Sequence, residues 1–353
     1  MPDHAQPNRA ERLVRQFVGF AGGDRDDASP LYRQLALGVS EDPEMLALAG
    51  RATSEPAAYL FMGAVHYLLL QGARHPLIAF YPSLTPSPLP PADAYRVFRD
   101  FCFAHVPAIT RLIQTRRVQT NEVRRCAMLL PAFGIVGERA GGRQLAVVEI
   151  GASAGLNLLW DRLGYDYGRG RRYGDPGAAV QLTCELRGDL QPPFPDVFPP
   201  VASRLGIDLH PVDVRDPDAT AWLRALIWPE HSARVELLER ALAVVRRDPP
   251  EIRAGDALDL LPGIMDSVPE GALLSIFHSF TVNQFSDEGR SRLAAILADY
   301  GSKRDLCCIS IEGHRITYPQ LRLLSYAGGV ETERLLATCS GHGRWMEWLV
   351  VGG

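Results

Sequence analysis

The sequence predicts an α/β protein, with a helical N-terminal domain followed by a mostly parallel sheet that has helices on both faces. Three observations predict this class. Apolar residues recur at helical spacing through the first third, short apolar runs alternate with amphipathic stretches after Gly141-Gly142, and two closing runs are placed to form an antiparallel pair at the sheet edge. We expect a helical domain over residues 1–135 and the sheet domain over residues 136–353, with an insert at about 165–200.

The helical domain is predicted from segments with one apolar side. These segments are residues 11–20, 31–39, 57–70, 92–115 and 121–133. Ser54-Glu55-Pro56 precedes the third of them and places proline in the first turn of a helix, where it is well tolerated. Residues 81–91 contain five prolines and are therefore expected to form a rigid connector.

The sheet domain is predicted from short apolar runs separated by amphipathic stretches. Core strands are expected at residues 145–150, 207–214, 252–257, 272–277 and 306–311, and the antiparallel pair at 334–338 and 345–350. Helices are expected between them at residues 156–163, 219–228, 231–247 and 291–300. Crossovers of this length suit parallel strands.

Composition argues against several classes of function. The 353 residues are 46% hydrophobic and 22% charged, and the net charge of −4 gives no general attraction to nucleic acid or to an anionic membrane. The longest apolar stretch, residues 57–70, is too short to span a bilayer. The six cysteines have no Cys-x-x-Cys spacing, so we expect a cytoplasmic protein without disulfides and without a metal site.

One loop is the main candidate for chemistry, and it runs Glu149-Ile150-Gly151-Ala152-Ser153-Ala154-Gly155 after a predicted strand. Its small residues would let a ligand approach the backbone, and the N–H groups of the following helix start would favour polar or negative groups. The carboxylate of Glu149 would hold a cationic or hydroxylated part of the ligand. Asn157, in the first turn after the loop, is a further candidate contact.

Acidic residues after the later strands favour a nucleoside ligand, because open parallel sheets bind ligands at the carboxyl ends of their strands. Asp213 follows the second core strand and is the candidate for ribose hydroxyls, with Glu185 as its rival. Asp256 and Ala257 follow the third strand and would suit an adenine amino group. The competing interpretation of each aspartate is a helix cap.

Two further pairs of residues are candidates for the acceptor side of the site. His278 and Ser279 follow a central strand, where a general base or a substrate contact would lie, and a capping histidine is the alternative. Asn121 and Glu122 start a helix, either as an ordinary cap with a first-turn acid or as a lid over the pocket. Glu312 is expected to be a solvated loop acid.

Other residues receive a structural interpretation. His66 lies mid-helix among apolar residues and is expected to be a hydrogen-bonded core histidine. Trp345 and Trp348 are expected in the core rather than as a base-stacking platform. A basic cluster is expected to be a solvated face, with an acidic substrate or RNA as the lesser alternative: Arg111, Arg116, Arg117, Arg124 and Arg125.

The same loop also matches G-x-S-x-G, the nucleophile elbow of serine hydrolases, with Ser153 as the nucleophile. The acid and the histidine would come from one of two downstream pairs, Asp256 with His278 or Asp305 with His342. Two features count against this alternative. The upstream third is helical and supplies no strands for an oxyanion loop, and a hydrolase has no use for the charge of Glu149.

The run from Val147 to Gly155 resembles motif I of class I S-adenosylmethionine-dependent methyltransferases, in which an acid precedes a spaced G-x-G-x-G. Ser153 stands where the middle glycine usually lies. The resemblance implies a Rossmann-like, methyltransferase-type sheet and S-adenosylmethionine as cofactor. We therefore expect the cofactor to be bound by Glu149, Gly151, Ala152, Ser153, Gly155, Asn157, Asp213, Asp256 and Ala257.

Nearly the whole chain resembles the bacterial domain of unknown function 2332 family. The segments that carry this resemblance are residues 65–70, 75–77, 79–83, 119–125, 149–160, 211–214, 255–257, 277–279 and 343–349. The family implies a methyltransferase-like fold and supplies no established reaction or substrate.

The sequence therefore predicts methyl transfer from S-adenosylmethionine to an unknown small-molecule acceptor, which the N-terminal helices would cover and select. No nucleic-acid or membrane partner is expected, and the oligomeric state is left open. Two other classes stay open: a serine hydrolase that uses Ser153, and a non-catalytic nucleoside-binding regulatory module.

Overall fold

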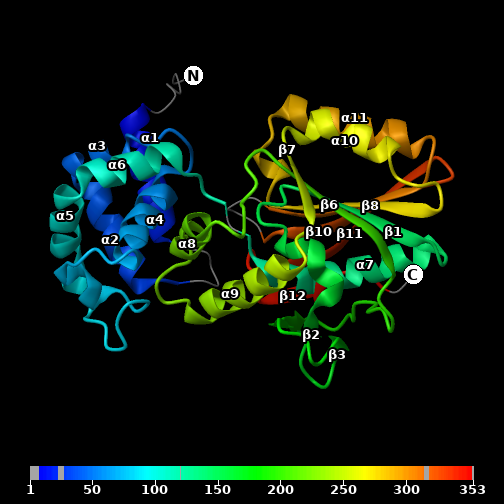
Figure 1. Cartoon of the computed structure of the whole chain (residues 1–353), viewed down its shortest axis with the longest axis horizontal. Coiled ribbons are helices and arrows are strands. Elements are labelled where there is room, and N and C mark those ends of the chain that lie inside the picture. Colours follow the sequence, from blue (N-terminus) through cyan, green and yellow to red (C-terminus); the bar gives the residue numbers. More distant parts are fainter. Residues whose placement is uncertain (1–7, 23–27, 120, 314–317, 352–353) are drawn as a thin grey trace, which may run out of the picture. The chain divides into compact units, whose positions relative to one another are not determined.

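The chain divides into two compact units in a computed structural model that describes residues 8–22, 28–119, 121–313 and 318–351. The helical unit comprises Met1–Thr120 and Asp216–Glu236, and the sheet unit comprises Asn121–Arg215 and Leu237–Gly353 (Figure 1). Residues 121–135, expected with the N-terminal helices, thus group with the sheet. The segment Asp216–Glu236, expected in the sheet domain, groups with the helices.

The helical unit packs its helices around one apolar core, to which α4 contributes most of its length. Side chains cap several helix starts, including Ser29 before α2 and Asp42 before α3. Its elements are α1 (Arg9–Ala21), α2 (Pro30–Glu41), α3 (Pro43–Ala49), α4 (Ala57–Leu70), η1 (Pro76–Phe80), η2 (Pro91–Asp93), α5 (Ala94–Ala104), α6 (Val106–Thr115) and α8 (Pro217–Ala225).

The helix predicted at residues 57–70 is confirmed. Of the connector predicted at residues 81–91, residues 81–90 lie outside helices and strands, and Pro91 begins the 3-10 helix η2. The single helix predicted at residues 92–115 is wrong. The chain turns at His105, and α6 restarts with Pro107 in its first turn. Proline has no N–H and would clash inside one continuous helix, which explains the break.

The described part of the sheet unit contains two sheets and the helices that cover the larger one. The strands are β1 (Gln144–Ile150), β2 (Gly164–Asp166), β3 (Arg172–Gly174), β4 (Gln181–Thr183), β5 (Glu185–Arg187), β6 (Val201–Asp208), β7 (Glu251–Ala254), β8 (Ala272–Ser279), β9 (Leu306–Glu312), β10 (Gln320–Ala327), β11 (Val330–Cys339) and β12 (Trp345–Trp348). The helices are η3 (Val123–Arg125), α7 (Cys126–Ala140), η4 (Leu156–Arg162), α10 (Ala257–Asp266), η5 (Val282–Gln284) and α11 (Asp287–Gly301), and α9 (Ser232–Arg247) leads the chain back into this unit.

Among the described residues, nine strands form one sheet in the order β5-β12-β11-β10-β9-β8-β1-β6-β7. The five strands from β7 to β9 are parallel, and β10, β11 and β12 follow as an antiparallel series. The mostly parallel α/β sheet with antiparallel C-terminal strands is thus confirmed. The parallel strands stand in the order third, second, first, fourth, fifth along the chain, so the order reverses between β1 and β8, where ligands bind in doubly wound sheets.

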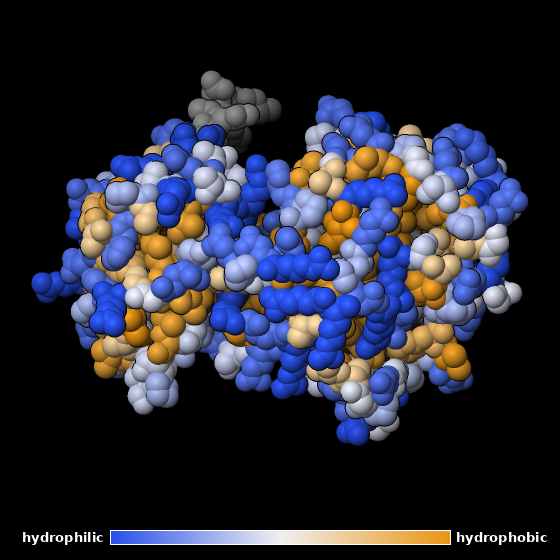
Figure 2. Space-filling view, in the orientation of Figure 1, coloured by the Kyte–Doolittle hydropathy of each residue, from blue (hydrophilic) through white to orange (hydrophobic). Residues whose placement is uncertain are grey.

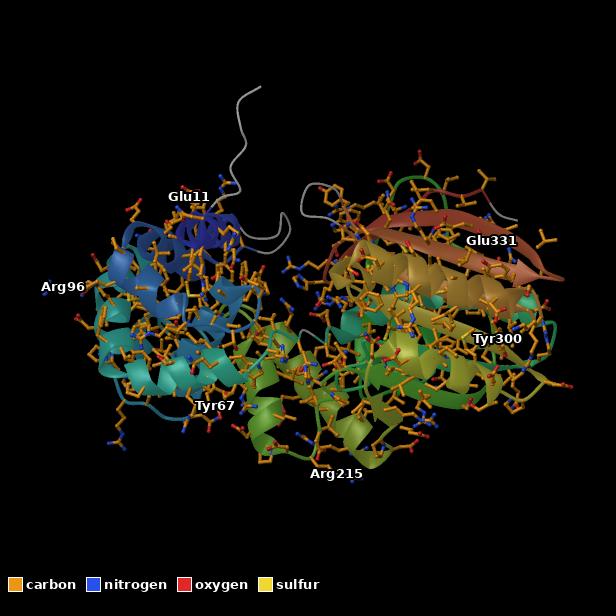
Figure 3. All side chains as sticks on the ribbon, turned by 90° about the horizontal axis from the view of Figure 1, so that it is seen from above. Glu11, Tyr67, Arg96, Arg215, Tyr300 and Glu331 are labelled. Carbon is orange, nitrogen blue, oxygen red and sulfur yellow. The ribbon has the colours of Figure 1, made fainter. Side chains whose placement is uncertain are left out.

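Alternation along the strands assigns side chains to the two faces of this sheet, which Figure 1 shows between α10 and α11 above and α7 below. Val148 and Ile150 of β1 belong to the core formed with α10 and α11, so Glu149 lies on the α7 face. On the α11 side, Tyr300, labelled in Figure 3, donates a 3.0 Å hydrogen bond to the Met265 carbonyl of α10.

The differences from the predicted strands include the position of β6 and the existence of β10. The second core strand is β6, Val201–Asp208, rather than residues 207–214, which form a loop after Asp208. Pro211 in this loop lacks the N–H that a central strand needs, and the polar residues of β6 hide its alternation. Strand β10 was missed because Arg322 and Ser325 interrupt its apolar pattern, although every second residue is buried.

The surface and the cysteines add little that is specific to a function. On the face in Figure 2, hydrophilic residues form a band across the sheet unit between separate hydrophobic patches. Within the described ranges, no helix is both long and apolar enough to cross a membrane. All six cysteines are free and buried.

Candidate functional site

Glu149 lies at the carboxyl end of β1 and is only 1% exposed. Its Oε1 accepts one long hydrogen bond, 3.4 Å from Asn157 Nδ2, and its Oε2 has no hydrogen-bond partner within the described residues. Burial raises the pKa of Glu149 well above its usual range. The Asn157 hydrogen bond opposes this shift, nearby Asp208 adds to it and Arg125 opposes it. A buried carboxylate with so little pairing would be stabilised by an added donor or cation.

Backbone N–H groups of the loop that follows β1 donate hydrogen bonds that hold the loop in place. The donors and acceptors are Gly151 to the Ile207 carbonyl (2.8 Å), Ala152 to the same carbonyl (3.1 Å), Ser153 to Asp208 Oδ2 (2.8 Å), Gly155 to the Ala152 carbonyl (2.7 Å) and Leu156 to Asn121 Oδ1 (3.2 Å). The following helix, η4, is a 3-10 helix of seven residues. These five amides are therefore not available to a ligand, which weakens the expectation that the loop favours polar or negative groups.

The glycines of this loop are explained by packing within the protein. Gly151 has φ of +77°, and a Cβ added there would lie 2.1 Å from Thr281 Oγ1. Gly155 has φ of +73°, and its Cβ would lie 2.7 Å from Pro250 Cγ. Side chains are excluded by the left-handed backbone and by these neighbours, so the glycine pattern by itself does not require a ligand.

Two strained residues flank the point where the strand order reverses. In the part of the chain that is described, three non-glycine residues have positive φ, and two of them are Ser153 after β1 (+51°) and Phe280 after β8 (+55°). Ser153 is buried, and its Oγ has no hydrogen-bond partner among the described residues. Backbone strain of this kind concentrates at functional sites.

Arg125 of η3 is a buried cation beside this point. Its Nη1 donates a 3.4 Å hydrogen bond to Ser279 Oγ, its Nε donates to the Gly341 carbonyl at 3.2 Å, and its guanidinium lies 4.3 Å from the centre of the Phe280 ring. The interpretation of Arg125 as part of a solvated basic face is therefore wrong, because it is only 6% exposed.

Asn121 and Glu122 do contact the elements around the loop. The Asn121 side chain accepts the hydrogen bond from Leu156, which fixes the start of η4. Glu122 is buried, and its Oε1 accepts a 3.3 Å hydrogen bond from the Arg124 N–H, which caps η3. The cap is thus Glu122 rather than Asn121, so the expected order of a cap followed by a first-turn acid is wrong, and the role of both residues as a lid stays a prediction.

The buried His278 and the partly buried Glu312 form a pair at the ends of β8 and β9. The Nδ1 of His278 lies 2.7 Å from Glu312 Oε1. The carboxylate also accepts hydrogen bonds from three backbone N–H groups: Thr281 at 3.1 Å, Val282 at 3.0 Å and Asn283 at 3.2 Å. Glu312 thereby fixes the turn that places Thr281 against Gly151, and its description as a solvated loop acid is wrong.

The protonation of this pair argues against a general base at His278. Burial alone would lower the pKa of His278, but hydrogen bonds with Cys308 and Glu312 outweigh it and raise the pKa to about 9. Burial opposes the charge of Glu312, yet His278 and the turn amides lower its pKa. A protonated histidine cannot accept a proton near neutral pH. The register also puts His278 beside Ile150 on the α10 face, away from Glu149.

Ser279 is separated from His278 although the two are adjacent in sequence. Strand alternation turns Ser279 to the α7 face, where it meets Arg125. The two residues were predicted to act as one acceptor-side pair, but in the structure they have different neighbours. Ser279 remains with Glu149 and Arg125 on one face of the sheet.

The candidates for the ribose are not where the sequence placed them. Asp213 is exposed in the loop after β6, where its Oδ1 accepts a 2.8 Å hydrogen bond from the Arg215 N–H. Glu185 lies in β5, at the opposite edge of the nine-stranded sheet from β6 and β7. The carboxylate that ends β6 is Asp208, which binds the Ser153 N–H and which the sequence analysis missed.

Asp256 and Ala257 lie beside Asp208, at the end of β7. The Gly255 N–H donates a 2.9 Å hydrogen bond to the Asp208 carbonyl, which holds the two strand ends together. The Asp256 side chain accepts a 2.8 Å hydrogen bond from the Leu258 N–H and caps α10, and Ala257 is buried as the first residue of that helix. The helix-cap interpretation of Asp256 is thus confirmed, and its exposed carboxylate still faces solvent at this edge.

Neither predicted hydrolase triad is assembled around Ser153. His278 is paired with Glu312, and Asp256 is a helix cap. Asp305 precedes β9 and pairs with Arg143 at 3.2 Å. Because parallel strands share one direction, Asp305 lies at the amino edge of the sheet and Ser153 at the carboxyl edge.

The comparisons with known proteins identify a family. A family model described as an uncharacterized protein conserved in bacteria, DUF2332, matches residues 14–348. The chain belongs to this family. The match spans segments of both units, and the family description names no reaction. No curated protein matches the chain.

The candidate site therefore comprises Glu149, Ser153 and Asp208 around one loop, with Arg125 and Ser279 beside it on the α7 face. Within the described ranges, no group of three or more histidine, cysteine, aspartate or glutamate side chains is arranged to hold a metal ion. The arrangement offers carboxylates to a ligand and few free backbone amides. It suits a cationic or hydroxylated ligand better than a phosphate.

Proposed function

We propose that the sheet unit has a Rossmann-like, methyltransferase-type fold, binds S-adenosylmethionine at the ends of β1, β6 and β7, and transfers its methyl group to a small-molecule acceptor. One observation carries the proposal, namely the buried and unpartnered Oε2 of Glu149 beside a loop of small residues. The amino-acid end of S-adenosylmethionine has an ammonium group, and an ammonium next to this carboxylate would stabilise its charged form. The strand order around β1 supports the fold.

The hydrogen bonds of the loop favour this ligand over a dinucleotide. A pyrophosphate needs backbone N–H groups, and those of Gly151, Ala152 and Ser153 are donated to the protein. S-adenosylmethionine has no phosphate and presents an ammonium, a sulfonium and two ribose hydroxyls. In the proposal, Asp208 takes the ribose role first expected of Asp213, and Asp256 stays the candidate for adenine.

The sulfonium of S-adenosylmethionine supplies the reactivity of the methyl group when it is bound. This leaves orientation to the protein, together with exclusion of water and recognition of the acceptor. Ser279 and Arg125 are the acceptor-side candidates, because they lie on the same face of the sheet as Glu149. His278 has a positioning role through Glu312 instead.

Calorimetry of the full chain with S-adenosylmethionine and S-adenosylhomocysteine tests the proposal. We expect both to bind, and Glu149→Gln to weaken binding by about 10-fold or more, since hydrogen bonds to charged groups contribute about 1.5–3 kcal/mol. Glu185→Gln is the matched control, because Glu185 is exposed at the far sheet edge. A folded wild-type chain that binds neither compound would refute the cofactor assignment.

Gly151→Val is a poor test of binding, although the glycine loop suggests it. The added side chain would meet Thr281 and a left-handed backbone, so lost binding would report only a distorted loop. Binding of cofactor without methyl transfer to a broad panel of small acceptors would favour the non-catalytic module instead.

A serine hydrolase that uses Ser153 is the second candidate, and one observation favours it. Ser153 has the strained backbone expected of a nucleophile elbow, and its hydroxyl is unpartnered within the described residues. Covalent labelling by a fluorophosphonate that maps to Ser153 and disappears in Ser153→Ala would establish this function in place of methyl transfer.

A further inference from the structure

The helical unit contains a serine–histidine pair that is independent of the proposed methyltransferase site. His66 of α4 is 1% exposed, and its Nε2 lies 2.8 Å from Ser83 Oγ. Its Nδ1 lies 3.0 Å from the Ala225 carbonyl at the end of α8. A carbonyl only accepts hydrogen bonds, so Nδ1 carries the ring proton and Nε2 is the acceptor for the Ser83 hydroxyl.

Ser83 is presented on a rigid turn. The Leu84 N–H donates a 2.9 Å hydrogen bond to the Tyr81 carbonyl, which closes a turn with Pro82 and Ser83 at its centre. Proline at the second position of a turn fixes the backbone. Ser83 itself is exposed. The serine thus faces solvent while the histidine beneath it is buried.

This arrangement has the parts of an activated nucleophile. Such sites place a serine within hydrogen-bond reach of a base, and a third group orients the base. Ser83, His66 and the Ala225 carbonyl meet these conditions. Ser153, by contrast, is buried and without a partner among the described residues, although its sequence matches the hydrolase motif.

We propose that Ser83 and His66 form a nucleophilic dyad that cleaves small, uncharged carboxylic esters. The connector around Ser83, residues 81–92, has no charged side chain and exposes Leu89. It therefore offers an apolar rim to the acyl group of an uncharged ester. Tyr67, which follows His66 in sequence and is labelled in Figure 3, is not part of this dyad, because its hydroxyl donates a hydrogen bond to Asp218.

The reaction is an acyl transfer in two halves. Ser83 Oγ bonds to the ester carbonyl carbon while its proton moves to His66 Nε2, and the bond to the alcohol oxygen then breaks as the imidazolium returns the proton to that oxygen. In the second half, water bonds to the acyl carbon and gives a proton to His66. The acyl–Oγ bond breaks, Oγ regains the proton, and the carboxylic acid leaves.

The surroundings of His66 set the pH range of this chemistry. Burial lowers the pKa of His66 to about 4, although its hydrogen bonds to the Ala225 and Ile227 carbonyls oppose the shift, and Arg224 lowers it further. Tyr81, whose ring centre is 5.5 Å from that of His66, is its other titratable neighbour. The ring stays neutral above about pH 5 and is a weak base, so the turnover is expected to be slow.

Labelling of the full chain with a fluorophosphonate, followed by mass-spectrometric mapping, tests the dyad. We expect Ser83 to be modified, the modification to be absent in Ser83→Ala, and its rate to fall about 100-fold or more in His66→Gln. Ser87→Ala, on the same exposed connector, is the matched control and should label as wild type does. A folded wild-type chain unmodified at Ser83, or a folded His66→Gln chain labelled at the wild-type rate, would overturn the proposal.

The wild-type pH profile gives a readout that does not depend on the folding of His66→Gln. The labelling rate at Ser83 is expected to stay level from pH 9 to pH 6 and to fall only as the pH approaches 4. A rate that halves near pH 6.5, as with an ordinary histidine, would assign the proton transfer to another group. Hydrolysis of p-nitrophenyl butyrate should follow the same profile and be lost in Ser83→Ala, and hydrolysis that persists in this variant would refute the esterase activity.

Discussion

Glu149 and Glu312 occupy equivalent places in the sheet unit and have opposite surroundings. They lie near the carboxyl ends of β1 and β9, on either side of β8. Glu312 meets His278 and three backbone N–H groups, and its pKa is lowered. Glu149 has one long hydrogen bond, and its pKa is raised by burial. The fully paired carboxylate supports the turn after β8, and the carboxylate with one long hydrogen bond is the centre of the proposed ligand site. Replacing each by glutamine tests this contrast.

The largest effect is expected for Glu312→Gln. The substitution leaves a buried, protonated His278 without its anion and weakens the support of the turn after β8. Breaking a buried pair in this way costs about 3–5 kcal/mol. Urea denaturation at pH 7 measures the loss, and Glu270→Gln, at an exposed position, is the control. A loss below about 1 kcal/mol would mean that the pair does not stabilise the fold.

The pH dependence of stability is expected to show the same pair. The pKa of His278 is raised to about 9, so its contribution is fully present below the unfolded value near 6.5 and is lost as the pH rises through 9. The pKa of Glu312 is lowered, so its contribution is present above its unfolded value and is lost as the pH falls below it. The pair therefore stabilises most between about pH 5 and pH 6.5.

The free energy of unfolding should accordingly fall by up to about 3 kcal/mol between pH 6.5 and pH 9.5. Urea denaturation across this range measures the slope in wild type and in Glu312→Gln. The variant is expected to lose part of the slope, because the Glu312 contribution to the raised pKa of His278 is removed while that of Cys308 remains. An unchanged slope in the variant would assign it to other groups.

The periodicity of the sequence predicted most of the fold. Helix α4 and strand β1 are mostly apolar, interrupted chiefly by His66 and Glu149, and both were placed within one residue of their bounds. Strand β6 was shifted because polar and small residues interrupt its apolar ones, and its neighbours β1 and β7 decide its position more than its own pattern does. Helix α8 groups with the helical unit through contacts between residues far apart in sequence, which a local pattern cannot predict.

The candidate site was predicted only where its residues are close in sequence. Glu149 and Asn157 were named together and do form a hydrogen bond. Asp208 was missed because the strand was extended past its true end, although Pro211 shortly after it was a usable sign. Arg125 and Glu312 were misjudged because their partners, Ser279 and His278, come from distant segments brought together by the sheet.

A smaller effect is expected for Gly151→Ala. This position links the surroundings of Glu149 to those of Glu312, because Thr281, held by Glu312, lies against Gly151. Its positive φ costs an alanine about 1–2 kcal/mol, and the contact with Thr281 adds to that cost. We expect a total loss of about 2–3 kcal/mol in urea denaturation. Gly263→Ala in α10 is the control, because its Cβ meets nothing within 4 Å and should stabilise the helix slightly.

Thr281→Ala separates the two costs of Gly151→Ala, since it removes the atoms nearest to the added Cβ. The double variant should recover the packing part of the loss and keep the backbone part. Double-mutant additivity, with no recovery, would show that Thr281 does not lie against the loop.

The smallest effect on stability is expected for Glu149→Gln in the absence of ligand. Because the pKa of Glu149 is raised, the folded chain binds more protons than the unfolded chain above pH 4.5, and stability falls as the pH rises through the folded pKa. Glutamine removes this slope and keeps an oxygen for Asn157. The free energy of unfolding at pH 7.5 should therefore match or exceed that of wild type, within about 1 kcal/mol.

A loss as large as that of Glu312→Gln would mean that Glu149 also stabilises the fold, and the contrast that points to a ligand would disappear. If the Glu149→Gln variant keeps its stability while its binding of S-adenosylmethionine is weakened, the buried carboxylate of Glu149 serves ligand binding and not the stability of the fold.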